Sequence, residues 1–382
     1  MSTPAKTKRR KRRPEIFVEI LDTTLRDGEQ AEGVSMVPAE KLTIAKRMLE
    51  KVKVDRVEVA SGRTSEGERI AVDRIMTWAE DAGFADRIEI LGFVDNKASV
   101  DWTRAAGGRV INLLTKSSLK HCCEQLRRTP QQHLDDIART IDYGTRHGVA
   151  FNIYLEDWSS GMRESRDYVM NHLSALTNMP IQRLMLCDTL GILSPAEVRR
   201  FVLELTSTFP EHQFDYHGHN DYGLATANTL EAALAGAVGV HCTVNGMGER
   251  AGNTALDEAV VSLRDHGGLR TRVNERALAA VSQLVEVFSG RRIAVNKPIV
   301  GENVFTQAAG VHADGDMKGK LYESQLHPSR FGLRRSYAMG KLMGKASLEF
   351  NLKRLNITLT NEQKQQLLDR IVELGDQKRR IT

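Results

Sequence analysis

Short hydrophobic runs alternate with helical hydrophobic patterns along the first 265 residues of the chain. The runs are rich in β-branched and aromatic residues, which is typical of strands. We expect eight of them, at 16–25, 54–60, 87–94, 109–115, 149–156, 183–189, 213–219 and 239–245. Apolar residues at helical spacing predict the helices between them, among them 38–52, 194–208 and 221–236.

This alternation predicts an α/β fold in which parallel strands are joined by helical crossovers. Eight strand–helix units indicate a closed (β/α)8 TIM barrel, which takes roughly 250 residues. An open doubly wound sheet is the alternative. No GxGxxG follows the first predicted strand, and this absence disfavours the dinucleotide-binding form of that alternative.

The pattern changes after residue 268. A helix is expected over 274–289, residues 296–345 show little periodicity, and two helices are expected over 345–356 and 360–375. We therefore expect a catalytic barrel over 15–268, a linker helix within 269–295 and a small, mostly helical C-terminal subdomain over 296–382. A further regulatory domain is not expected.

The composition, with 41% hydrophobic and 27% charged residues, is ordinary for a soluble enzyme. No apolar run approaches the roughly 20 residues of a membrane span, and no secretory signal follows the basic N-terminus. The four cysteines include no CxxC pair, which favours a reducing, cytoplasmic location and free thiols.

The basic character of the chain comes from its N-terminus. Residues 6–13 carry seven positive charges, and without them the net charge of +5 becomes −2. We expect residues 1–14 to be a disordered, solvated arm, with contact to RNA or to an acidic partner as the alternative. The rest of the chain predicts neither a nucleic-acid nor a membrane partner.

Two segments carry residues suited to metal binding. Asp27 follows the first strand, and the adjacent Arg26 favours its ionised form, which is a good ligand for a hard cation. His217 and His219, at the end of the seventh strand, are two residues apart and therefore share a face. Taken singly, Asp27 could belong to a polar turn and the histidines to a hydrogen-bonded surface pair. Together, at one rim of a barrel, they predict a catalytic metal site.

A glycine-containing loop after the eighth strand, 245–254, is a weaker signal. Its three glycines would allow close approach to a ligand, and Asn253 could add an oxygen ligand to the metal. Zinc, magnesium and manganese all tolerate two histidines and a carboxylate, so the sequence leaves the identity of the divalent ion open.

Longer motifs resemble a known enzyme family. They are Leu-Arg-Asp-Gly-Glu-Gln at 25–30, the long run from His-Gly-His-Asn-Asp-Tyr-Gly that starts at 217, Gly-Glu-Arg-Ala-Gly-Asn-Thr at 248–254, and Gly-Val-His-Ala-Asp-Gly at 310–315. They are similar to the signatures of the 2-isopropylmalate, citramalate and homocitrate synthase family. That family belongs to a wider group of metal-dependent TIM-barrel enzymes that includes hydroxymethylglutaryl-CoA lyase. The resemblance covers residues 16–376.

The resemblance implies a metal-dependent Claisen condensation of acetyl-CoA with a 2-oxo acid. Arg26 would neutralise the keto oxygen and Thr189 would bind the substrate carboxylate. Glu156 would be the base that removes a methyl proton. The alternative for Glu156 is an ordinary ion pair.

The resemblance also implies a homodimer. His312 and Tyr322 match subdomain residues that reach the active site of a neighbouring subunit in this family, where we expect a catalytic role. The alternative for both residues is packing within the subdomain.

Three residues bear on the choice of the 2-oxo acid. Leu91, Leu114 and Tyr154, on the third, fourth and fifth strands, would form a small dry pocket that suits a methyl group, as in the citramalate synthases that the chain resembles. Pyruvate is therefore the expected substrate and citramalate the product, with 2-isopropylmalate synthase as the alternative. The pocket offers no cation for a second carboxylate, so homocitrate synthase is less expected. The leucines could also be barrel core.

Two further alternatives are less favoured. The lyases of the group carry a cysteine in their glycine loop, whereas residues 246–252 contain none and Cys242 lies before the loop. A non-enzymatic binding module would require a vestigial metal site.

Overall fold

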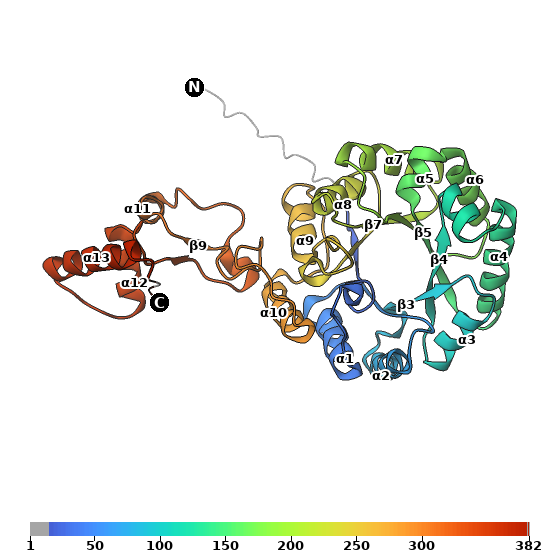
Figure 1. Cartoon of the computed structure of the whole chain (residues 1–382), viewed down its shortest axis with the longest axis horizontal. Helices are drawn as coiled ribbons and strands as arrows, with labels where there is room; N and C mark the ends of the chain where they lie inside the picture. Colours follow the sequence, from blue (N-terminus) through green and yellow to red (C-terminus); the bar gives the residue numbers. More distant parts are fainter. Residues whose placement is uncertain (1–14, 380, 382) are drawn as a thin grey trace, which may run out of the picture.

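The structure is a computed structural model that describes residues 15–379 and 381. Within this range eight parallel strands close into a barrel in the order β1 to β8, with β8 pairing with β1 (Figure 1). The expected (β/α)8 barrel is confirmed. The strands are β1 (Glu19–Asp22), β2 (Arg56–Ser61), β3 (Ile88–Phe93), β4 (Val110–Lys116), β5 (Ala150–Glu156), β6 (Arg183–Asp188), β7 (Gln213–Gly218) and β8 (Gly239–Cys242). The expected basic arm, residues 1–14, lies outside the described residues.

Helices surround the barrel on its outer face (Figure 1). The helices around the barrel are α1 (Pro38–Lys46), α2 (Glu66–Ala82), α3 (Ala98–Ala105), α4 (Pro130–Arg146), α5 (Trp158–Glu164), α6 (Arg166–Leu176), α7 (Pro195–Thr208), α8 (Ala225–Leu234), α9 (Leu256–Asp265) and α10 (Leu278–Ser289). None of the helices in the described range is long and apolar enough to cross a membrane.

Every barrel strand except β4 is shorter than the hydrophobic run that predicts it, and the first is the clearest case. Strand β1 ends at Asp22, so Asp27 lies in the following turn instead of at the strand end. The backbone N–H groups of Arg26, Asp27 and Gly28 all point back to the carbonyl oxygen of Thr23, at 3.1, 2.9 and 3.0 Å. These bonds turn the chain away from the sheet and present Arg26 and Asp27 at the rim.

The barrel interior has an ionic end and an apolar middle. Near the strand starts, Arg56 contacts Glu89 at 2.9 Å and Asp215 at 2.5 Å, and Arg183 contacts Asp215 at 3.0 Å. Above this network lies a separate apolar cluster of inward-facing residues, Leu21, Leu91, Tyr154, Met185 and Cys187. Side chains thus fill the N-terminal end, and the C-terminal end is where a cavity forms.

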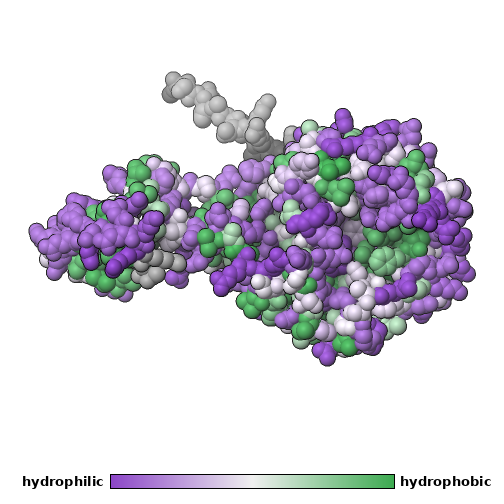
Figure 2. All heavy atoms as spheres, in the orientation of Figure 1, coloured by the Kyte–Doolittle hydropathy of each residue, from purple (hydrophilic) through white to green (hydrophobic). Residues whose placement is uncertain are grey.

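The C-terminal region extends away from the barrel (Figure 1). It contains a two-stranded parallel sheet and three helices: β9 (Thr306–Gln307), β10 (Ser336–Tyr337), α11 (Gly310–Gly319), α12 (Lys345–Arg354) and α13 (Asn361–Asp376). The sequence pattern did not indicate helix α11, because its three glycines and polar residues obscure any helical hydrophobic period. Hydrophobic residues appear on the surface of this extension (Figure 2), and exposed apolar side chains there include Val311, Leu321 and Leu342.

Candidate active site

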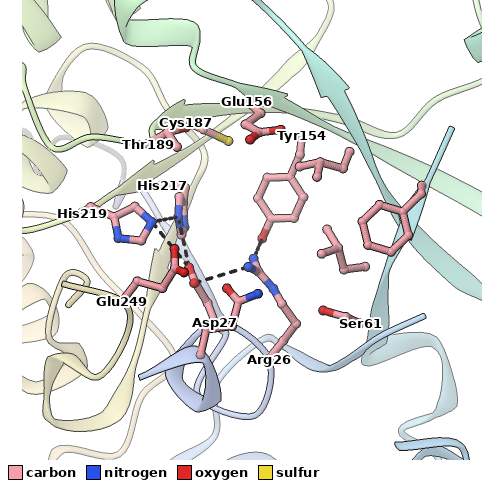
Figure 3. A pocket seen from close by; sticks show the side chains of 14 residues that line it. Arg26, Asp27, Ser61, Tyr154, Glu156, Cys187, Thr189, His217, His219 and Glu249 are labelled. Carbon is pink, nitrogen blue, oxygen red and sulfur yellow. Dashed lines mark hydrogen bonds and ion pairs between the residues drawn. The ribbon is translucent and has the colours of Figure 1, made fainter. Parts of the chain in front are cut away.

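Three potential metal ligands meet at the C-terminal rim of the barrel (Figure 3). Possible ligand atoms of Asp27, His217 and His219 all lie within 4.8 Å of one another. Asp27 Oδ2 is 3.2 Å from His217 Nε2 and 3.9 Å from His219 Nε2, and the two Nε2 atoms are 3.3 Å apart. Two imidazole nitrogens and a carboxylate oxygen therefore face one point.

The electrostatics keep Asp27 and His219 in the protonation states that metal binding requires. Burial alone would raise the pKa of Asp27, but the charge of Arg26 and the neighbouring His217 outweigh it and hold this pKa well below its usual range. Burial, with the neighbouring His217, lowers the pKa of His219 to about 4. At neutral pH Asp27 is thus ionised and His219 neutral.

Unpaired buried oxygens show that the site fits a cation. Asp27 Oδ2 and Asn253 Oδ1 are both buried and have no hydrogen-bond donor. Asn253 forms an isolated backbone bridge with His219, and its side-chain amide donates to the carbonyl oxygen of Met247, leaving Oδ1 without a partner. A buried acceptor without a donor is costly, and a cation bound between Asp27 and the two histidines would satisfy Asp27 Oδ2.

Arg26 is held on the other side of Asp27 by two buried side chains. Its Nε contacts Glu58 at 2.5 Å, and its Nη2 donates to the Tyr154 hydroxyl over 3.1 Å. Burial would lower the pKa of Arg26, but Glu58 and Asp27 raise it well above its usual value. Our sequence reasoning did not identify Glu58, although an acidic residue between two valines inside strand β2 was the available signal.

A cavity of about 220 Å³ lies between these groups (Figure 3). The predicted residues Leu91, Leu114, Tyr154, Glu156 and Thr189 all line it, together with Arg26 and the three potential ligands. Residues that the sequence reasoning missed complete the wall: Gln30, Ser61, Phe93, Cys187 and Glu249. The cavity is smaller than most ligand pockets, which commonly span about 300–1,000 Å³.

Two polar residues of the wall, Thr189 and Glu156, have different bonding partners. The Thr189 hydroxyl oxygen accepts a hydrogen bond from the backbone N–H of Asp157 at 2.9 Å, which leaves its own proton available to a ligand. Glu156, the last residue of β5, forms an ion pair with Lys116, the last residue of β4. Glu156 is thus ion-paired and also faces the cavity.

A buried lysine that the sequence reasoning missed supports the Arg26 turn. Lys41 has no solvent exposure, and its ammonium group donates to the carbonyl oxygens of Leu25 at 3.0 Å and Val59 at 3.3 Å. It also pairs with Glu29 at 2.6 Å. Since Leu25 precedes Arg26 and Val59 follows Glu58, this lysine ties together the two backbone segments that present the Arg26–Glu58 pair.

His312 and Tyr322 lie apart from this cavity. Their rings are 4.3 Å apart, and His312 belongs to α11 in the C-terminal extension (Figure 1). Neither residue is among those that line the cavity within the described chain. The single chain therefore does not bring them to the Asp27 cluster.

Comparisons with known proteins find relatives along nearly the whole chain. It is 34% identical to the (R)-citramalate synthase of Methanocaldococcus jannaschii, over 94% of this chain and 72% of that protein. It is also 34% identical to the 2-isopropylmalate synthase of Sulfurisphaera tokodaii, over 94% of this chain and 91% of that protein. An HMG-CoA lyase structure from Brucella melitensis, with 20% sequence identity, matches with a TM-score of 0.60 over 72% of this chain and 99% of that chain. At this identity, the structural likeness shows the fold.

Two family profiles match consecutive parts of the chain. The HMGL-like profile matches residues 17–285, and the homocitrate synthase post-HMGL domain-like profile matches residues 299–379. The first covers the barrel and the second covers the C-terminal extension. The resemblance inferred from the motifs is thereby confirmed: this chain belongs to the HMGL-like family of enzymes, among relatives named citramalate synthase and 2-isopropylmalate synthase.

Proposed function

We propose that the protein is a citramalate synthase, which condenses acetyl-CoA with pyruvate and releases CoA. The observation that carries this proposal is the small cavity beside Asp27, His217 and His219, whose wall includes Leu91 and Tyr154. These bulky side chains leave room for a methyl group and little room for a branched one. No cation beyond Arg26 lines the cavity in the described chain, which disfavours a second substrate carboxylate.

The residues of the site would have distinct roles in this reaction. Asp27, His217 and His219, with Asn253, would hold a divalent cation, which supplies Lewis-acid stabilisation of a developing alkoxide. Arg26, fixed by Glu58, places a permanent positive charge beside the keto oxygen.

The other polar groups would bind the substrate and move the proton. Thr189 has a free hydroxyl proton to donate to the substrate carboxylate, because its oxygen accepts from Asp157. Glu156 faces the same cavity and takes a proton from the acetyl methyl group.

The alternative, 2-isopropylmalate synthase acting on 2-oxoisovalerate, has comparable support from the relatives. Methanocaldococcus jannaschii has a protein of each name, and the chain is 34% identical to both. Overall identity therefore does not discriminate between the two substrates. One methylene in such a pocket typically changes selectivity by only about 1–3 kcal/mol. The side chains of the cavity wall therefore determine which of the two 2-oxo acids is preferred.

A thiol-release assay tests the proposal. Free CoA is measured from acetyl-CoA with pyruvate, 2-oxobutyrate, 2-oxoisovalerate and 2-oxoglutarate in turn, with chelator-treated enzyme as the control. We expect the highest kcat/KM for pyruvate. A higher kcat/KM for 2-oxoisovalerate would overturn the pocket argument, and no CoA release with any 2-oxo acid would exclude a synthase.

We further propose that the active unit is a homodimer in which the C-terminal extension of one copy supplies His312 and Tyr322 to the barrel of the other. The separation of these residues from their own cavity and the exposed Val311 and Leu321 support this arrangement. A mixture of the Asp27→Ala and His312→Ala variants should regain activity, because each mixed dimer has one intact site. Sedimentation as a monomer at assay concentrations, or no regain of activity in a mixture shown to exchange subunits, would contradict it.

A further inference from the structure

A second cavity, of about 590 Å³, adjoins the candidate active site. The two cavities share Phe93, Leu114 and Glu156 in their walls. Glu156 therefore lies at the boundary, with the metal-ligand cluster on one side and the larger cavity on the other. A molecule that reached the small cavity from the larger one would pass this carboxylate.

Lys116 also lines the larger cavity, and it is held firmly beside Glu156. The two residues are direct partners in the pairing of β4 with β5, and their side chains form an ion pair in which the lysine side chain is only 10% exposed. The backbone of Lys116 is fixed as well: its N–H donates to His133 Nε2 at 3.0 Å, and its carbonyl oxygen accepts from the Tyr168 hydroxyl at 2.9 Å. The position of Lys116 in the cavity wall is thus fixed by both its backbone and its side chain.

The other two basic residues of this wall, Arg128 and His133, do not offer a free positive charge to Glu156. Arg128 is half exposed and pairs with Asp136 at 3.3 Å. Burial lowers the pKa of His133 to about 4, so this ring is neutral at neutral pH. Among the described residues that line the cavity, Lys116 alone brings a positive charge into contact with Glu156.

Resting on the proposed function, we propose that Lys116 is a further catalytic residue, which stabilises the enolate of acetyl-CoA. In this step a methyl C–H bond of the acetyl group breaks and its proton moves to the Glu156 carboxylate. The electron pair of that bond forms the enolate double bond, and the negative charge moves to the thioester oxygen. The Lys116 ammonium group donates a hydrogen bond to that oxygen.

The ion pair makes this step electrostatically balanced. Before proton transfer, the Lys116 ammonium is paired with the Glu156 carboxylate. After transfer Glu156 is neutral, and the enolate oxygen has become the anion. The ammonium group therefore has one anionic partner throughout, and no unpaired charge appears in this partly buried site.

The test replaces Lys116 with Met, which keeps an unbranched side chain of nearly the same length and removes the charge. Lys116→Arg keeps a positive charge, and Lys120→Met removes an exposed lysine of the same segment as a matched control. Two quantities are measured: CoA release with pyruvate, and deuterium uptake into the acetyl-CoA methyl group in D₂O with oxamate, an unreactive analogue, in place of pyruvate. The second readout does not need condensation.

We expect Lys116→Met to lower kcat by about 10²–10³-fold, as does loss of a donor to a developing oxyanion elsewhere. Methyl exchange should fall in the same proportion, the KM for pyruvate should stay within about twofold, and Lys116→Arg should restore part of both rates. Lys120→Met should match the wild type. Lys116→Gln, a neutral polar variant, gives the same comparison if the Met variant does not fold.

The outcomes distinguish failure of the Lys116 proposal from failure of the synthase proposal. Wild-type exchange and kcat values in Lys116→Met would overturn the role of Lys116 and leave the synthase proposal intact, as would a change confined to the KM for acetyl-CoA. Methyl exchange by the wild type without CoA release for any 2-oxo acid would overturn the synthase proposal alone. Neither exchange nor release would overturn both.

Discussion

The Nη2 of Arg26 lies 3.1 Å from the hydroxyl oxygen of Tyr154, and the guanidinium carbon lies 5.3 Å from the centre of that ring. Tyr154 also lines the small cavity with Leu91 and Leu114. One tyrosine therefore lines the cavity that would hold the substrate side chain and contacts the arginine that would face its keto oxygen. Mutations can separate selectivity for substrate size from stabilisation of the transition state only if the hydroxyl of Tyr154 and the apolar wall of the cavity are changed one at a time.

Tyr154→Phe removes the hydroxyl oxygen that accepts a hydrogen bond from Arg26, with almost no change in volume. We expect kcat to fall by about tenfold, the effect of a lost hydrogen bond to a charged group, while the ranking of the 2-oxo acids stays the same. Tyr216→Phe is the matched control, because the Tyr216 hydroxyl is buried without a partner and its loss should leave kcat unchanged. The measurement is kcat and kcat/KM over the substrate panel. A change of ranking in Tyr154→Phe would contradict this separation of roles.

Leu91→Ala enlarges the cavity where the substrate side chain would lie. We expect the ratio of kcat/KM for 2-oxoisovalerate to that for pyruvate to rise by about 10–200-fold. Leu113→Ala is the control, because Leu113 packs in the helix-facing core and should lose comparable stability, about 2–5 kcal/mol, without a change of selectivity. An unchanged ratio in Leu91→Ala would show that Leu91 is only barrel core.

Each of Asp27→Asn, His217→Gln and His219→Gln should abolish the binding of one divalent ion per chain. The reason is that two histidines and one carboxylate provide the geometry, and loss of any member leaves too few strong ligands. Bound metal is measured by elemental analysis after dialysis, with thermal unfolding as a check of folding. His212→Gln, at the opposite end of β7, should bind metal as the wild type does. Stoichiometric metal in all three site variants would place the metal elsewhere.

The buried pair His133 and His172 should make the fold acid-sensitive. Burial, with the neighbouring His133, lowers the pKa of His172 to about 3, and both of its ring nitrogens lack hydrogen-bond partners. The unfolded chain protonates this residue below its ordinary pKa of about 6.5, whereas the folded chain keeps it neutral. The contribution of neutral His172 to the free energy of unfolding is therefore fully present above about pH 6.5, and it is lost as the pH drops towards 3.

Substitution of His172 by Phe keeps a ring stacked between Tyr168 and His133, whose centroids lie 5.5 and 5.6 Å from that of His172. Denaturant unfolding at pH 7 and pH 4.5 should show a smaller loss of free energy of unfolding for this variant than for the wild type. Equal losses would mean that His172 is protonated in the folded state or that other groups govern the acid limb.

The sequence by itself determined the barrel and the residue types of the candidate metal cluster. Short hydrophobic runs rich in β-branched and aromatic residues, separated by helical patterns, lead to parallel strands, because only a crossover joins such strands. His217 and His219 share a face because side chains two apart on a strand do so, and the ends of parallel strands meet at one rim. The motifs, long and specific, led to the family that the profiles confirm.

Only the tertiary structure decided what surrounds these groups. The contacts of Arg26 with Glu58 and Tyr154 join residues that are 32 and 128 positions apart in the chain. The Lys116–Glu156 pair depends on the register between β4 and β5. Such partners follow from barrel closure and from side-chain packing in three dimensions, which the period of a single strand does not encode.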